Sequence, residues 1–145
     1  MAIQPNYELL KISKINGIGA DAVPNRFVQI KASDPKSFIK PVVAGAPCLG
    51  VLLPDLRYEE GKTPDGKAGS IMVAGIIDAE CAATIPALHY VKVDIEGRLL
   101  DVGSADGLSL SDGTTQVGIV GINLEAGEEG SKVAVQLIPQ VAFLA

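Results

Sequence analysis

Residues 91–102, with the sequence VKVDIEGRLLDV, decide the fold class. Val91, Val93 and Ile95 alternate with polar residues, which is the period of two expected of a strand with one buried and one exposed face. A polar step follows, in which Gly97 can adopt the positive φ of a tight turn, and the chain then returns to an apolar run. The stretch therefore predicts a β-hairpin.

The rest of the chain repeats this pattern of short apolar runs and turn residues. Further strands are predicted at residues 26–32, 49–53, 70–77, 116–124 and 132–138, with Pro35 and Pro139 just outside the first and last of them. The runs at 70–77 and 116–124 are apolar at successive positions, so we expect both of their faces to be buried. Residues 54–69 and 103–114 are rich in Gly, Pro and charge and predict exposed loops. Such a pattern predicts an all-β fold, a small single-domain β-barrel or sandwich.

The length of 145 residues and a hydrophobic content of 48% fit one folded domain. Residues 1–25 lack a clear period, and Asn16-Gly17 interrupts them. We expect them to form an extended N-terminal arm with at most one strand, poorly ordered in the free protein. Residues 26–145 form the barrel or sandwich domain in this interpretation.

The charge is unevenly distributed along the chain. The net charge is −5, but residues 1–40 hold six Lys or Arg against three Asp or Glu, whereas residues 101–145 hold one against six. An acidic protein is a poor match for nucleic acid, because phosphate contacts need clustered basic residues. The basic leading segment could dock on an acidic partner, although a solvated face is the more frequent meaning of such a segment. With neither a secretory signal pattern nor an apolar run of about 20 residues, we expect no membrane partner.

Residues that could carry chemistry are few. Cys48 and Cys81 lie in apolar runs, so two buried free thiols are favoured over a single bridge. His89 is the only histidine, which excludes a metal site built on paired histidines and leaves a catalytic triad without a spare base. We therefore expect no catalytic residue, no metal site and no cofactor. Asp106-Gly107 and Asp112-Gly113 lack calcium-loop spacing and fit turns.

Three short motifs resemble nucleotide sites, and each lacks a necessary part. Gly61-Lys62-Thr63 has the end of a P-loop, but position 56 is Leu and a proline follows the motif. Gly17-Ile18-Gly19 lacks a third glycine at position 22. Residues 75–78 (GIID) match the Gly-x-Ile-Asp of trimeric dUTP pyrophosphatases, but the tyrosine that follows in that family is missing.

The order of several motifs resembles the head-decoration, or cement, proteins of tailed bacteriophages. The motifs are RFV at 26–28, GAP and LGV at 45–51, the run at 68–77, VKVD and EGR at 91–98, VGI at 117–119 and the hairpin at 125–138. Members of that family often have Gly-Asp before the Val-Lys-Val-Asp strand, where this chain has Leu88-His89. The difference affects the local turn.

The resemblance implies a structural virion protein made in the host cytoplasm. It would bind the outer capsid surface, form a homotrimer and stabilise the shell by bridging major capsid subunits. We expect Leu9, Leu10, Lys11, Ile12, Lys14 and Arg26 to contact the capsid, the basic residues steering the arm and the apolar ones holding it. A phage tail or baseplate component is the nearest alternative, and a small trimeric β-fold nucleotide hydrolase is a more distant one.

Overall fold

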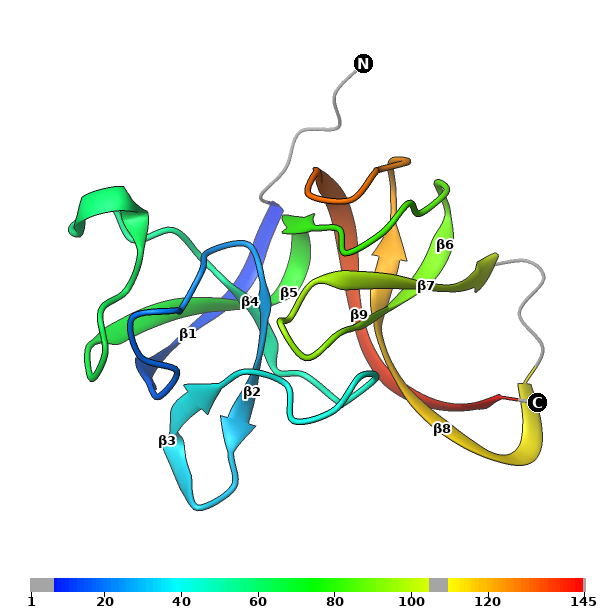
Figure 1. Cartoon of the computed structure of the whole chain (residues 1–145), viewed down its shortest axis with the longest axis horizontal. Helices are drawn as coiled ribbons and strands as arrows, with labels where there is room; N and C mark the ends of the chain where they lie inside the picture. Colours follow the sequence, from blue (N-terminus) through cyan, green and yellow to red (C-terminus); the bar gives the residue numbers. More distant parts are fainter. Residues whose placement is uncertain (1–6, 105–109, 145) are drawn as a thin grey trace.

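The computed structural model describes residues 7–104 and 110–144, which form an all-β structure (Figure 1). Their strands are β1 (Tyr7–Asn16), β2 (Phe27–Lys31), β3 (Asp34–Ile39), β4 (Gly50–Leu52), β5 (Ala68–Glu80), β6 (His89–Val93), β7 (Leu99–Ser104), β8 (Leu110–Asn123) and β9 (Lys132–Leu144). A short 3-10 turn, η1 (Glu59–Gly61), lies in the loop before β5. No helix in these described ranges has the length and apolar character needed to cross a bilayer.

Five strands close into a small barrel. Their order is β1-β3-β2-β4-β5, and β5 pairs again with β1, so the sheet returns to its starting strand. The β1–β5 pairing is antiparallel and extends from Tyr7 opposite Ile76 to Ile15 opposite Ala68. The long β1–β5 pair therefore completes the barrel wall. This confirms the predicted all-β class, and of the two predicted architectures, barrel or sandwich, these five strands form the barrel.

A second sheet grows from the same long strand. Its order is β5-β9-β8-β6-β7, and β9 joins β5 from Ile76 to Glu80, beyond the short pairing with β4. In Figure 1 the barrel strands lie on the left and the second sheet on the right, with β5 between them. The single strand β5 therefore belongs to both halves of the molecule.

Two apolar cores lie on opposite faces of the wall formed by β2, β4 and β5. Val28, Leu52 and Ile71 pack with Ala22 and Phe38 in the smaller core inside the barrel. Their chain neighbours Phe27, Val51 and Met72 belong instead to the larger core, together with residues of the second sheet. Because successive side chains of a strand point to opposite faces, this wall must be apolar at every position.

The predicted hairpin at residues 91–102 is confirmed as β6 and β7. Val93 pairs with Leu99, and Gly97 takes a φ of 80° in the connecting turn. A side chain at position 97 would collide with the carbonyl oxygen of Phe27, so the turn also needs glycine for its close approach. Ile95 was expected on the buried face, but the strand ends at Val93 and Ile95 lies in the turn, 55% exposed.

The other predicted strands also form, but the prolines beside them do not end strands as expected. Residues 26–32, 49–53, 70–77, 116–124 and 132–138 correspond to β2, β4, β5, β8 and β9. Pro35 lies inside β3, a strand that the sequence did not predict, near a register shift against β2. Pro139 lies inside β9, which continues to Leu144. Both prolines lie in strands that have a neighbour on only one side at that position, where a missing donor is tolerated.

The leading residues differ most from the expected free arm. The one strand allowed for residues 1–25 is β1, and it is paired with β5 as part of the barrel wall. Ala22 is buried in the barrel core, and the amide of Asn25 donates a hydrogen bond to the carbonyl of Leu52. The structure therefore joins residues 7–25 to the body of the protein.

Candidate docking surface

The outer edge of β1 is open along most of its length. On its inner edge β1 pairs with β5, and on its outer edge it pairs with β3 only at Ile15 and Asn16. Along Tyr7 to Lys14 no strand of the described chain lies on the outer edge. An open edge of this kind offers backbone donors and acceptors to an incoming strand.

Five of the six predicted contact residues lie on β1, and the structure describes the side chains of four of them. Leu10 is 53% exposed and Lys11 is also exposed, whereas Ile12 is half-buried and packs against the barrel core. The ammonium of Lys14 donates a hydrogen bond to the carbonyl of Pro35 at 2.9 Å. For Leu9 the structure describes only the backbone position, at a β-bulge between Glu8 and Leu10. Leu10 and Lys11 are thus the exposed members of the predicted set.

Basic residues from other strands gather near the end of this edge. Lys14 bonds the carbonyl of Pro35, the residue before Lys36, and the charges of Lys36 and Lys31 both stabilise the carboxylate of Asp34. The pKa of Asp34 is lowered, first by its hydrogen bond from Ser37 and also by these two lysines. Lys31 and Lys36 are not among the predicted contact residues, because they reach this surface only through the pairing of β3 with β1 and β2.

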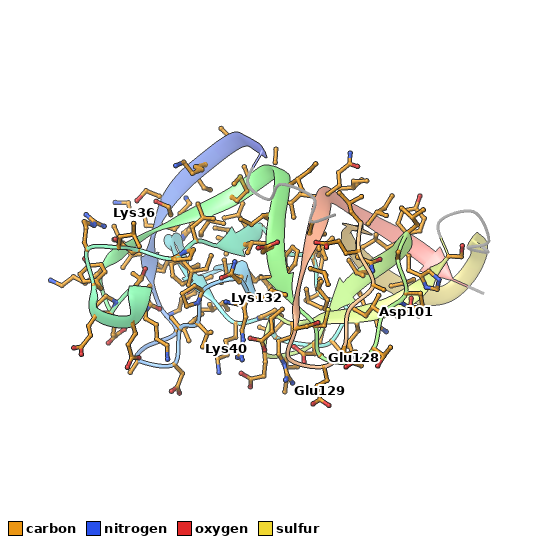
Figure 2. All side chains as sticks on the ribbon, turned by 90° about the horizontal axis from the view of Figure 1, so that it is seen from above. Lys36, Lys40, Asp101, Glu128, Glu129 and Lys132 are labelled. Atoms are coloured by element: carbon orange, nitrogen blue, oxygen red, sulfur yellow. The ribbon has the colours of Figure 1, made fainter. Side chains whose placement is uncertain are left out.

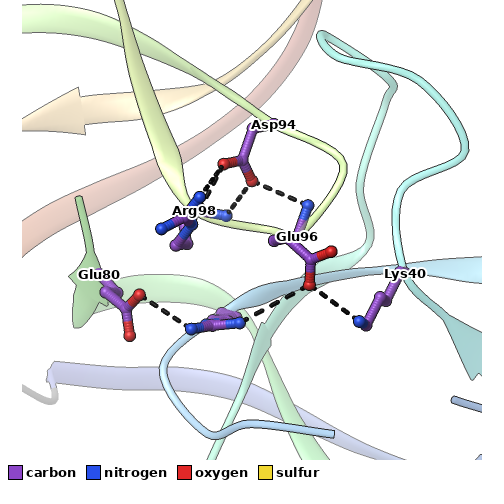
Figure 3. A network of polar contacts seen from close by, with 6 residues as sticks. Lys40, Glu80, Asp94, Glu96 and Arg98 are labelled. Atoms are coloured by element: carbon purple, nitrogen blue, oxygen red, sulfur yellow. Dashed lines mark hydrogen bonds and ion pairs between the residues drawn. The ribbon is translucent and has the colours of Figure 1, made fainter. Parts of the chain in front are cut away.

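Arg26 belongs to a different polar cluster, at the junction of the two halves (Figure 3). Its guanidinium contacts Glu80 at 3.0 Å and Glu96 at 3.8 Å, and Glu96 also accepts a hydrogen bond from Lys40 at 2.8 Å. The Arg26 side chain is 22% exposed, and its buried Nε has no partner among the described residues. A neighbouring pair joins Arg98 to Asp94 within the β6–β7 turn.

The structure does not bring Arg26 together with Lys11 and Lys14. Lys14 lies opposite Gly69 near the start of β5, whereas Arg26 binds Glu80 at the end of the same strand. Arg26 was expected to steer the arm onto a capsid, but its guanidinium is paired with Glu80 and Glu96 within the protein. Its local role is to connect the start of β2 with β5 and the β6–β7 turn.

The two halves of the molecule also differ in charge. Figure 2 shows Lys36 in the barrel half, and Asp101, Glu128 and Glu129 in the half that contains the second sheet. Residues 7–75 contain nine Lys or Arg against seven Asp or Glu, and residues 76–145 contain three against ten. Positive charge is therefore concentrated on the half that carries the open edge of β1.

The cysteines and the histidine occupy structural positions. Both thiols are free, with Cys81 buried and Cys48 half-buried against the larger core. Burial raises the pKa of Cys48 to about 12, so this thiol is a weak nucleophile. His89 contacts Asp101 through Nδ1 at 2.7 Å between β6 and β7. In the described parts of the chain, no three His, Cys, Asp or Glu side chains gather in an arrangement that could hold a metal ion.

The nucleotide-like motifs are used for folding. Gly61 is the last residue of η1, and Lys62 and Thr63 follow it in the loop. Thr63 is buried there, and its carbonyl accepts a hydrogen bond from the side-chain amide of Asn16. The GIID motif lies in β5, where Gly75 pairs with β1 and Asp78 with β9.

The two Asp-Gly pairs were expected in turns. Asp112-Gly113 is instead part of β8, and Asp106-Gly107 lies outside the described residues.

An open sheet edge can accept a strand from another protein through backbone hydrogen bonds. No protein-family model and no curated protein matches the sequence. Among solved structures, the fold is similar to the head fiber gp8.5 N base of bacteriophage phi29, with a TM-score of 0.61. The alignment covers 89% of this chain and 93% of the other at 10% identity, so the likeness shows a shared fold.

Proposed function

We propose that this chain is a structural protein of a phage virion that binds the outer surface of the capsid. In this proposal the open edge of β1 docks on the major capsid protein, and each bound copy stabilises the shell by bridging neighbouring subunits. The observation that carries the proposal is the combination of an open, basic strand edge with a fold shared by a phage head fiber base. The motif order that resembles head-decoration proteins supports the same location.

In this proposal the charged and the apolar residues of the β1 edge contribute to different steps of binding. An exposed ion pair contributes about 0 to 1 kcal/mol, so Lys11 and Lys14 mainly accelerate the encounter with an acidic surface. Burying the exposed side chain of Leu10 contributes about 1.5 to 3 kcal/mol and holds the docked state. Many such modest contacts add up over a shell because each copy bridges several subunits.

The main alternative within the same class is a component of the phage tail or baseplate, since such a protein would also use a rigid β-body and an open edge. The enzyme alternative has less support. Gly75 and Asp78, the ends of its GIID motif, are both paired in the middle of the sheet.

The test is binding of purified protein to capsids that lack it. Leu10→Asp should weaken binding about tenfold or more, since it removes the apolar contact and introduces a charge. Lys11→Glu combined with Lys14→Glu should slow association strongly at low salt and much less at high salt. Co-sedimentation measures the affinity, and electron microscopy of decorated particles gives the location.

Leu56→Asp is the matched control, because Leu56 is 95% exposed but lies in the loop before β5 and not on β1. It should bind capsids as the wild type does. Decorated particles should also release their genome at a higher temperature than bare ones. Images that show the protein on the tail would replace the capsid proposal by the tail alternative, and equal binding of Leu10→Asp would remove β1 from the interface.

A further inference from the structure

One asparagine of the chain is set for spontaneous loss of its side-chain amide. The chain contains Asn6, Asn16, Asn25 and Asn123, and only Asn16 is followed by glycine. In a flexible chain an Asn-Gly pair deamidates fastest, because glycine has no side chain that hinders the attack of its amide nitrogen on the asparagine side chain. Asn16 is the last residue of β1, so the reactive pair lies where this strand of the barrel wall ends.

The structure holds the reacting side chain in place. Asn16 is 1% exposed, and its Nδ2 donates hydrogen bonds to the carbonyls of Gly19 at 2.9 Å and Thr63 at 2.8 Å. Its Oδ1 accepts hydrogen bonds from the amides of Ile18 at 2.7 Å and Gly19 at 3.2 Å. Both amide hydrogens and both oxygen lone pairs are therefore in use, which opposes rotation of the group toward the next peptide.

The attacking nitrogen is held as well. The amide of Gly17 donates a hydrogen bond to the carbonyl of Phe38 at 2.9 Å. A methyl group on Gly17 would lie 2.9 Å from the same oxygen, so β3 packs closely against this peptide. The backbone of Asn16 also bonds the loop before β5, through the carbonyl of Lys67 and the amide of Gly66. Reaction therefore requires the end of β1 to separate from β3 and from this loop.

We propose that Asn16 is a conformation-gated deamidation site, unreactive in the closed barrel and reactive when the end of β1 opens. The Gly17 nitrogen gives up its proton and bonds to the side-chain carbonyl carbon of Asn16, while the bond from that carbon to Nδ2 breaks and ammonia leaves. Water then hydrolyses the resulting succinimide to an aspartate or an isoaspartate.

Either product opposes closure of the barrel. An aspartate at position 16 would place a carboxylate oxygen against the carbonyls of Gly19 and Thr63, in a site almost without solvent. An isoaspartate would lengthen the main chain by one methylene group within the β1–β3 pairing. An opening of β1 that ends in reaction is therefore irreversible, since refolding does not undo the chemical change.

This proposal goes beyond capsid binding and does not depend on it, so its test uses the free, full-length chain. Folded and urea-unfolded protein are incubated at mildly alkaline pH, and peptide mapping by mass spectrometry follows the conversion of Asn16. The mass change separates this reaction from isomerisation at Asp65-Gly66, which leaves the mass unchanged. Conversion should be at least about tenfold slower in the folded protein, because only the open fraction reacts. Equal rates would overturn the proposal.

Two matched variants test whether opening of β1 controls the rate. Ile12→Ala removes a half-buried contact between β1 and the barrel core, so the folded variant should deamidate about tenfold faster than the wild type. Ile95→Ala makes the same substitution at a 55% exposed position in the β6–β7 turn and should deamidate at the wild-type rate. Circular dichroism checks that both variants are folded. A wild-type rate in Ile12→Ala, or an equal increase in Ile95→Ala, would overturn the gating by β1.

The effect of the product is tested with Asn16→Asp. The amide of Gly66, which donates to the backbone carbonyl of Asn16 at 3.0 Å, should exchange with solvent at least about tenfold faster in this variant than in the wild type. The amide of Leu88, bonded to the carbonyl of Asn123 in the second sheet, is the internal reference and should keep its wild-type exchange rate. Wild-type exchange at Gly66 would overturn the claim that deamidation keeps the end of the barrel open.

Discussion

Replacing Arg26 with Met is expected to lower the free energy of unfolding by about 2 to 3 kcal/mol, because it removes the centre of the polar cluster between the two halves. The Glu80 carboxylate, whose side chain is 14% exposed, would lose its 3.0 Å partner. Removing one partner of a fully buried pair costs about 3 to 5 kcal/mol, and an exposed pair contributes about 0 to 1. The partial burial of both side chains places the cost between these limits.

The comparison with Glu96 makes the estimate specific. The Glu96 side chain is 39% exposed and lies 3.8 Å from the guanidinium, so Glu96→Gln should cost less than about 1 kcal/mol. In a double-mutant cycle, Arg26→Met and Glu80→Gln should be coupled by about 1 kcal/mol or more, because removing Glu80 spares the protein an unpaired carboxylate.

Urea denaturation followed by circular dichroism measures these differences, provided that the variants keep the wild-type m-value. The melting temperature of Arg26→Met should fall by about 5 to 10 °C. Unchanged stability of Arg26→Met with slower capsid binding would refute this reasoning. Arg26 would then be the steering residue that the sequence suggested.

Two further changes test the junction between the barrel and the second sheet. Gly97→Ala should destabilise the protein by more than about 1 kcal/mol in the same urea assay, because the residue has positive φ and its new methyl group would meet the carbonyl of Phe27. Equal stability would show that the β6–β7 turn can move. The pKa of Glu96 is lowered from 4.5, first by the hydrogen bond from Lys40, so its contribution is present above pH 4.5 and is lost as the pH falls through the lower folded pKa. The stability difference between wild type and Glu96→Gln should therefore shrink on acidification, and a difference that grows would contradict this sign.

The local elements could be predicted from the sequence because their signals are local. The alternation of Val91 and Val93 with polar residues and the glycine at position 97 are sufficient for a hairpin. The continuous apolar run of β5 predicted a strand buried on both faces, and Ile71 and Met72 do face two different cores. Short-range patterns thus identified most strands and the all-β class.

The closure of the barrel could not be predicted in this way. The sequence of β1 has no clear apolar period. The strand belongs to the barrel wall through its pairing with β5 and, at its end, with β3. The Lys14 side chain also reaches the carbonyl of Pro35, the residue before Lys36, and no spacing in the sequence predicts that contact. Arg26 was grouped with the basic arm for its position in the chain, whereas its partner Glu80 is 54 residues away.

The shared strand β5 has a kinetic consequence for the whole molecule. Neither the barrel nor the second sheet can lose β5 without opening the other, so the two halves should unfold as one cooperative unit. Closing the barrel also requires β1 to find a strand that the ribosome makes much later, and long-range pairings of this kind fold slowly. Amide hydrogens in the middle of β5 should therefore be the last to exchange with solvent, and the chain should acquire its native form only after most of it has been synthesised.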